Sequence, residues 1–188
     1  MTSALLLAAC GGGAGSDYNN EILQHRKELH KRFLKPGSPL SEKERKNFIS
    51  LNYFAPDSNY RVYARVDFLE NPETVYMATS TGKPREMIKR ALLHFELGGE
   101  NHSLTVFEPL EEDEDWFLPF TDETSGTSTY GGGRYLNLPD LSGKETAVID
   151  FNLAYNPYCH YNPEFSCPVP PRENDLGVGV RAGEKLYK

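Results

Sequence analysis

The sequence has little cysteine, an excess of acidic charge and no long apolar run. Its 188 residues include three cysteines, and 20 lysines and arginines stand against 27 aspartates and glutamates, which gives a net charge of −7. An acidic chain without a basic stripe does not fit a nucleic-acid-binding protein, so we expect no nucleic acid partner. No apolar run approaches the roughly 20 residues that a membrane-spanning helix needs.

Several catalytic and cofactor motifs are missing as well. The chain contains no Gly-x-Ser-x-Gly and no His-Glu-x-x-His sequence, the motifs of α/β-hydrolases and of many zinc proteases. The run Gly131–Gly133 lacks the lysine and hydroxyl residue of a phosphate-binding P-loop. Cys159 and Cys167 are separated by seven residues, which is wider than the cysteine spacing of structural zinc sites. We therefore expect no metal, identify no cofactor, and leave open whether the protein is an enzyme.

The first ten residues, MTSALLLAAC, resemble a bacterial lipoprotein signal. An apolar run from Ala4 to Ala9 ends in small residues directly before Cys10, which in such signals is lipidated and becomes the mature N-terminus. The alternatives are an ordinary secretory leader and a buried apolar strand. We expect a signal peptide with a lipobox over residues 1–10, a flexible tether over residues 11–16, and a single globular domain over residues 17–188.

A lipoprotein signal implies a place in the cell envelope, with the membrane as a partner through the lipid on Cys10. Gly11 follows that cysteine instead of an aspartate, which favours the outer membrane, or its periplasmic face, in a host with two membranes. Lipidation of Cys10 leaves two cysteines, and an oxidising envelope compartment favours joining them. We expect a disulfide between Cys159 and Cys167.

Hydrophobic periodicity predicts two helices followed by strands. Residues 17–35 have apolar residues near helical spacing, and Ser41 to Glu44 form a capping-box pattern for a second helix that ends near residue 49. Strands are predicted at residues 62–68 and 74–79, and hairpin-length turns join most of those that follow. The pattern predicts an α+β fold that is mainly antiparallel β, as a closed or partly open β-barrel with two N-terminal helices. A β-sandwich is the alternative.

Two segments carry the unusual residues of the chain. The 121–138 segment reads TDETSGTSTYGGGRYLNL, and the 150–174 segment reads DFNLAYNPYCHYNPEFSCPVPPREN, with five of the 13 prolines. Such a proline-rich stretch cannot continue as helix or sheet, and long irregular segments are usually functional. We expect the two segments to bind a small ligand or a protein partner. The candidate binding residues are Asp122, Tyr130, Gly131, Gly132, Gly133, Arg134, Asp150, Asn152, Tyr155 and Glu173.

Two other functions fit the same residues. In a hydrolase-like enzyme, Asp122, Asp150 or Glu173 would act as the base, provided that the two segments meet in space. In a purely structural envelope domain, the residues would form turns and polar contacts that hold the barrel together. Two interpretations are also open for Gly131–Gly133. The run is either a turn that requires glycine or a nest of backbone N–H groups that binds an anion beside Arg134.

Taken together, PFTDETSGTSTYGGGRYL, the 150–174 segment and the ending VGVRAGE resemble the bacterial family catalogued as domain of unknown function 1684. The resemblance covers nearly all of the expected mature chain, including Asn52–Asp57 and Thr79–Gly82. The sequence departs from the family pattern at Tyr158, where a second proline is expected, and at Gly177–Gly179. Because no activity is assigned to the family, the resemblance implies the extent of the domain and no mechanism.

Overall fold

The computed structural model describes residues 13–110 and 114–187. The predicted signal peptide and the first two residues of the tether therefore lie outside the described residues. The helices and strands of the described residues are α1 (Gly13–Phe33), α2 (Glu42–Lys46), β1 (Arg61–Met77), β2 (Arg85–Leu97), β3 (Glu100–Pro109), β4 (Trp116–Asp122), β5 (Arg134–Leu138), β6 (Thr146–Asp150) and β7 (Asp175–Leu176). Short 3-10 turns lie at Ser58–Tyr60, Phe151–Leu153, Tyr158–His160 and Arg172–Asn174.

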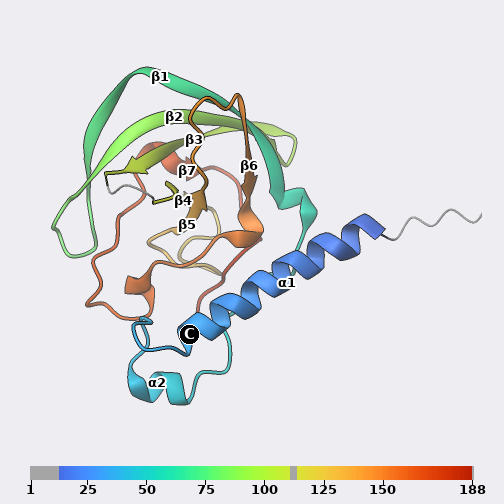
Figure 1. Ribbon diagram of the computed structural model, residues 1–188, viewed down its shortest axis with the longest axis vertical. Coiled ribbons are helices and arrows are strands. Elements are labelled where there is room, and N and C mark those ends of the chain that lie inside the picture. The colour runs from blue at the N-terminus through green and yellow to red at the C-terminus, as the bar shows by residue number, and fades with distance from the viewer. Residues whose placement is uncertain (1–12, 111–113, 188) are drawn as a thin grey trace, which may run out of the picture.

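The strands form one seven-stranded sheet that curls into an open half-barrel (Figure 1). The order is β5-β4-β3-β2-β1-β6 with antiparallel neighbours, and β7 adds a short parallel pairing to β4. The prediction of an α+β fold that is mainly antiparallel β is confirmed. The strand order ends at β5 on one side and at β6 on the other, so the barrel is open.

Alternating side chains of the strands build the core on the concave side of the sheet. In β2, Ala91, Leu93, Phe95 and Leu97 occupy every second position and all are buried, as expected for a strand with one face inside. The two strands predicted at 62–68 and 74–79 are one strand, β1, with a register shift between Phe68 and Glu73. A β-bulge of this kind bends a strand without ending it.

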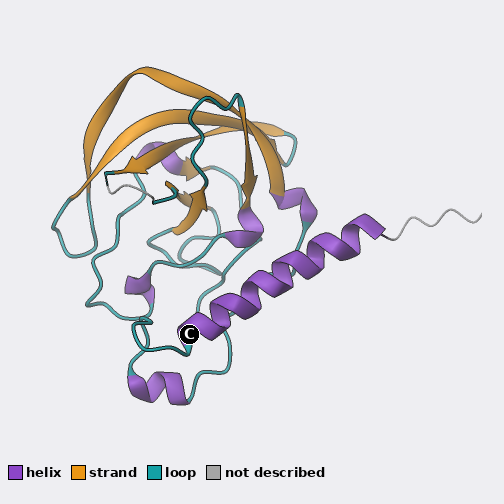
Figure 2. Cartoon of the chain, viewed as in Figure 1, coloured by secondary structure: helices purple, strands orange, loops and turns teal. Residues whose placement is uncertain are grey.

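Loops, not further strands, fill the open side of the half-barrel (Figure 2). Val180 and Ala182 of the C-terminal segment are fully buried in the same core cluster as the sheet residues. Because this segment closes the core, the contacts that hold it in place decide whether the half-barrel stays assembled.

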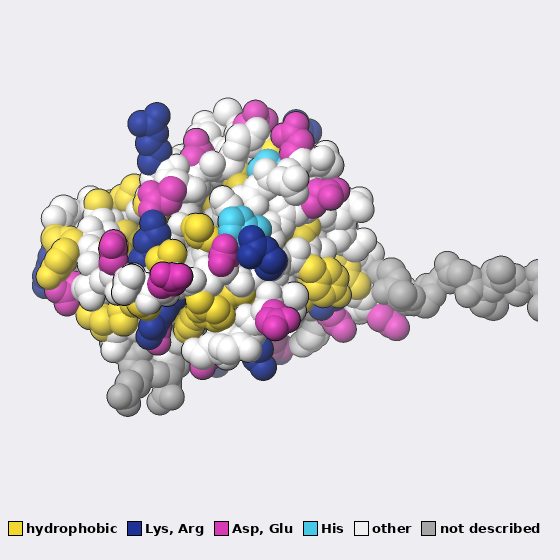
Figure 3. All heavy atoms as spheres, turned by 90° about the horizontal axis from the view of Figure 1, so that it is seen from above, with side chains coloured by type: hydrophobic (Ala, Val, Ile, Leu, Met, Phe, Trp, Pro, Cys, Tyr) yellow, Lys and Arg dark blue, Asp and Glu magenta, His cyan; other side chains and the backbone are white. Residues whose placement is uncertain are grey.

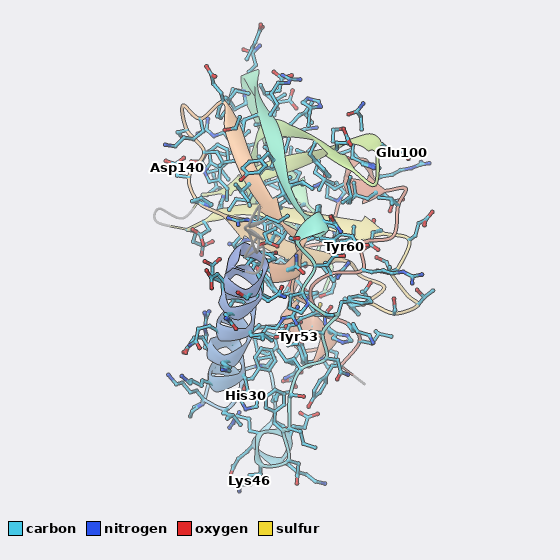
Figure 4. The ribbon with its side chains drawn as sticks, turned by 90° about the vertical axis from the view of Figure 1, so that its right-hand side faces the viewer. His30, Lys46, Tyr53, Tyr60, Glu100 and Asp140 are labelled. Carbon is cyan, nitrogen blue, oxygen red and sulfur yellow. The ribbon has the colours of Figure 1, made fainter. Side chains whose placement is uncertain are left out.

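The helix α1 lies beside these loops (Figure 4) and buries Tyr18, Ile22 and Phe33. Residues 13–16, which were predicted as part of a flexible tether, belong to this helix in the structure. The helix α2 has the predicted capping box, in which the Ser41 side chain accepts a hydrogen bond from the Glu44 N–H. Within the described residues, none of the helices has the length and apolar character needed to cross a bilayer.

Candidate functional site

The two unusual segments meet in space, as the sequence-based hypotheses required. Tyr135 of β5 and Tyr155 form an antiparallel bridge with N–O distances of 2.9 and 3.0 Å. The ring of Tyr130 lies 4.6 Å from the ring of His160. The 121–138 segment and the 150–174 segment therefore form one continuous region at the open side of the sheet.

Arg134 lies at the centre of this region and is fully buried. Its guanidinium donates hydrogen bonds to Asp122 Oδ2 at 2.9 Å, to the Val180 carbonyl at 2.8 Å and to the Glu184 carbonyl at 3.2 Å, and it also bonds the Ala182 carbonyl. These partners belong to β4 and to the C-terminal segment. The contacts give Arg134 a structural role, because they fasten the segment that closes the core.

Asp122 completes this fastening from the end of β4. Its Oδ1 accepts hydrogen bonds from the Thr124 N–H at 2.7 Å and from the Val180 N–H at 3.2 Å, while its Oδ2 faces Arg134. A buried carboxylate is stable when it is paired and hydrogen-bonded in this way. The two side chains neutralise each other inside the protein.

The glycine run forms a tightly packed turn. Gly133 has φ +86°, and a Cβ atom on it would lie 2.6 Å from the Phe120 carbonyl oxygen. A Cβ on Gly132 would lie 2.5 Å from the Tyr130 ring. Gly131 is less crowded, with Gly126 Cα at 3.4 Å from the same position. Close packing therefore accounts for glycine at two of the three positions.

A second polar cluster joins α1 to the end of β6. The Tyr18 hydroxyl donates to the Asp150 carboxylate at 2.9 Å, and Asn152 Nδ2 donates to the Tyr18 oxygen at 2.8 Å. Asn152 also binds both backbone polar groups of Asp57, at 2.9 and 2.8 Å. Burial, followed by the hydrogen bond to Asp150, raises the pKa of Tyr18. Asp150 and Asn152 thus hold α1 and the segment before β1 against the sheet.

The three carboxylates proposed as catalytic bases lie apart. Asp122 is paired with Arg134, Asp150 with Tyr18, and the exposed Glu173 with Lys89 at 3.3 Å. A cavity of about 350 Å³ is lined by Asp150 and not by the other two. The three proposed bases therefore do not face a common cavity.

A larger cavity, of about 660 Å³, lies between α1, the sheet and the 150–174 segment. We call it the aromatic cavity, because its lining includes the rings of Phe33, Phe117, Tyr135, Tyr155, Tyr158 and Phe165. Its exposed lining residues include Arg32, Glu114 and Asp115. Its buried polar lining consists of Asn156 and Glu184. Of the ten candidate binding residues, Tyr155 lines this cavity, and its hydroxyl donates to Asn137 Oδ1 at 2.8 Å.

The sequence analysis did not identify Glu184 as a candidate site residue. The single sequence signal for it is its position at the end of VGVRAGE, one of the segments that resemble the family. The side chain is 1% exposed, and its Oε2 accepts hydrogen bonds from the Asn156 N–H at 2.8 Å and from the Tyr161 hydroxyl at 2.7 Å. Burial raises the pKa of Glu184 to about 7. The Oδ1 atom of the neighbouring Asn156 is buried and has no hydrogen-bond partner among the described residues.

The predicted disulfide is absent, because Cys159 and Cys167 are free thiols. The Cys159 N–H instead donates a hydrogen bond to Cys167 Sγ at 3.1 Å, and Tyr130 Oη lies 3.9 Å from Cys159 Sγ. The sequence spacing correctly predicted that the two cysteines lie close together. Their contact is a hydrogen bond and not a covalent bond. A second hydrogen bond, between the two thiol side chains, lowers the pKa of Cys159 to about 6 and raises the pKa of Cys167. No cluster of His, Cys, Asp and Glu suited to a metal ion occurs in the part of the chain that the structure describes.

Comparison with known proteins identifies similar chains without an assigned activity. A family model described as "Protein of unknown function (DUF1684)" matches residues 46–185. The solution NMR structure of the uncharacterized protein from gene locus rrnAC0354 of Haloarcula marismortui is 38% identical, with a TM-score of 0.71, over 91% of this chain and 95% of that one. No curated protein matches.

Proposed function

The chain belongs to the DUF1684 family of proteins of unknown function, and we propose that it is a lipid-anchored envelope protein that binds a small molecule in the aromatic cavity. The observation that carries the proposal is the cavity itself, with its volume of about 660 Å³. Binding sites for small molecules are typically clefts of about 300–1,000 Å³, lined by apolar and aromatic side chains with a few polar groups.

The lining of the aromatic cavity has this composition. Both unusual segments contribute to it, through Tyr135 on one side and through Tyr155 and Tyr158 on the other. The polar side chains that a ligand in the cavity can reach include the exposed Arg32, Glu114 and Asp115. We therefore expect the two segments to form the binding region, as predicted from the sequence. The residues that contact the ligand are those that line the aromatic cavity, and Arg134 is not among them.

The lipid anchor is the second part of the proposal. It is supported by the sequence Leu7-Ala8-Ala9-Cys10 and by the glycines that follow. Growth of the host with a clickable fatty acid should label the wild-type protein and leave Cys10→Ser unlabelled. Labelling of both proteins, or of neither, would contradict an anchor at Cys10.

The ligand proposal is tested by native mass spectrometry of the protein purified from its host's envelope. We expect a mass above that of the acylated polypeptide that disappears on denaturation, which would also identify the ligand. A protein that carries no additional mass, and that acquires none when incubated with an extract of the same envelope, would contradict small-molecule binding.

A further inference from the structure

Positive charge is concentrated in the segment from the second half of α1 to the end of α2. Residues 26–46 contain eight lysines and arginines and three glutamates, a net charge of +5. The whole chain carries −7, so the remaining residues carry −12. An asymmetry of this size indicates a surface that attracts an anionic partner.

The lysines of this segment point to solvent. Five of them are exposed: Lys27, Lys31, Lys35, Lys43 and Lys46. Two of the five pair with neighbouring glutamates on the same helix, Lys31 with Glu28 at 2.9 Å and Lys46 with Glu42 at 2.7 Å. Exposed pairs of this kind contribute little energy, and the net charge of +5 already includes these glutamates.

Apolar side chains lie among these lysines. Leu23 and Leu34 are each 45% exposed, and Ile49, just after α2, is 88% exposed. Lys27 follows Leu23 by four residues in α1, so these two side chains share one face of the helix. Leu34 comes directly after the last residue of α1. The opposite face of α1 buries Tyr18, Ile22 and Phe33. Leu23 in α1 and Leu34 just after it are therefore apolar side chains that the described residues leave partly exposed.

The end of this surface is held rigidly. Phe48 stacks on Phe33 at 5.8 Å and on His30 at 5.1 Å, which packs the residue before Ile49 into a small core with Leu40 and Leu51. Figure 1 shows α2 at one end of the long axis of the molecule, and Lys46 lies at that end in Figure 4. The exposed Ile49 therefore directly follows a residue that is packed into this small core.

The outer face of the sheet has a different character. Figure 3 shows acidic and basic side chains interspersed over it, and Arg65 and Asp67, 3.4 Å apart, are one example. A net positive charge together with exposed apolar side chains characterises residues 26–49.

We propose that Leu23, Lys27, Leu34, Lys35, Lys43 and Ile49 form a membrane-docking surface that lies on a bilayer rich in anionic headgroups. The lysines contact the phosphates while their alkyl stems remain in the interface, and the three apolar side chains enter the boundary of the acyl chains. A nucleic acid would match the lysines and leave Ile49 without a role, which favours the lipid surface. This inference is independent of ligand binding in the aromatic cavity and does not require the lipid at Cys10.

The test uses the full chain with Cys10→Ser, so that no acyl chain contributes to binding. Adsorption is measured by flotation with vesicles of phosphatidylcholine and with vesicles of equal parts phosphatidylcholine and phosphatidylglycerol. We expect adsorption to the anionic vesicles alone, and a loss of it at high salt, because salt screens exposed charges.

A pair of double variants locates the surface. A lysine near an anionic surface strengthens adsorption about five-fold, so Lys35→Gln with Lys43→Gln should weaken it about 25-fold. The matched control is Lys83→Gln with Lys144→Gln, which changes the net charge equally at two exposed lysines outside the helices. Ile49→Ser should weaken adsorption while its salt dependence persists.

Three results would overturn the proposal. Equal adsorption to both kinds of vesicle would exclude recognition of anionic lipid. Equal losses in the two double variants would show that net charge, not this surface, is responsible. Tight binding to inorganic polyphosphate without adsorption to anionic vesicles would identify a site for soluble polyanions instead.

Discussion

The guanidinium of Arg134 and the carboxylate of Asp122 lie 2.9 Å apart, with side chains that are 0% and 1% exposed. Arg134 also bonds three carbonyl groups of the C-terminal segment, at Val180, Ala182 and Glu184. The pair therefore joins β4 and β5 to the segment that closes the core. The sequence predicted both residues as ligand contacts, and in the structure their contacts hold the fold together.

Breaking this pair should destabilise the protein strongly. Arg134→Met leaves the carboxylate of Asp122 buried without its partner, and such a change typically costs about 3–5 kcal/mol. The free energy of unfolding in urea measures the effect. The matched control is Glu173→Gln, which breaks the partly exposed pair with Lys89 and should cost at most about 1 kcal/mol. Similar losses in the two variants would contradict the structural role of Arg134.

Gly133 should not tolerate a side chain. Its φ is +86°, and a Cβ would lie 2.6 Å from the Phe120 carbonyl, which is closer than real Cβ atoms approach. Gly143 has a similar φ of +72° with no atom within 4 Å of the same position. Gly143→Ala should cost about 1 kcal/mol, the usual penalty for a positive φ, and Gly133→Ala clearly more. Thermal unfolding of the two variants makes the comparison, and equal midpoints would mean that the turn relaxes freely.

Glu184 should make the protein less stable as the pH rises. Burial raises its pKa in the folded state from the ordinary 4.5 to about 7, so the folded state holds the proton more tightly than the unfolded state does. The stabilising contribution is complete below pH 4.5 and is lost as the pH passes from 4.5 to 7, with a total of about 3 kcal/mol.

Glu184→Gln isolates this contribution, because glutamine resembles the protonated carboxyl and does not titrate. Unfolding free energies at a series of pH values should decline less for this variant than for the wild type. Parallel profiles for the two proteins would show that Glu184 does not titrate in this window.

Cys159 should react as a thiolate at neutral pH. Since the hydrogen bond from Cys167 lowers its pKa to about 6, alkylation by iodoacetamide should reach half its maximal rate near that pH. Cys167 should remain unmodified, because its pKa is raised and its side chain is buried. Peptide mass spectrometry after timed alkylation distinguishes the two sites. In Cys167→Ser, the midpoint for Cys159 should move toward higher pH.

Local patterns predicted the parts of the fold that depend on local physics. Alternation in residues 62–68 predicted a half-buried strand, and Ser41 and Glu44 predicted a helix start, because both signals arise from neighbouring residues. The concentration of unusual residues also indicated correctly which two segments lie together. Barrel closure could not be predicted, since it depends on which strands meet across the sheet.

The roles of polar side chains depended on partners that are remote in sequence. The sequence predicted Arg134 as a ligand contact and gave no sign of its partners Val180 and Ala182, which lie more than 40 residues away. Glu184 carried no signal of burial, because its partners Asn156 and Tyr161 lie more than 20 residues away. The spacing of Cys159 and Cys167 predicted proximity but not the hydrogen bond between the backbone of one and the sulfur of the other.

Binding of a small molecule in the aromatic cavity can be tested with variants that block the cavity and variants that leave it open. The quantity compared is the mass of ligand that remains bound to each purified variant. Leu29 and Leu23 lie on the same helix, the first in the cavity lining and the second exposed on the outer face. Leu29→Trp fills the cavity, whereas Leu23→Trp makes the same chemical change away from it. Asn137→Trp blocks the cavity from β5 at an exposed position, which covers the case in which Leu29→Trp fails to fold.

Native mass spectra of the variants, each purified from the host's envelope, give the answer. We expect Leu23→Trp to retain the additional mass of the wild type and Leu29→Trp and Asn137→Trp to lose it. A folded Asn137→Trp or Leu29→Trp protein that carries the same ligand mass as the wild type would contradict ligand binding in the aromatic cavity.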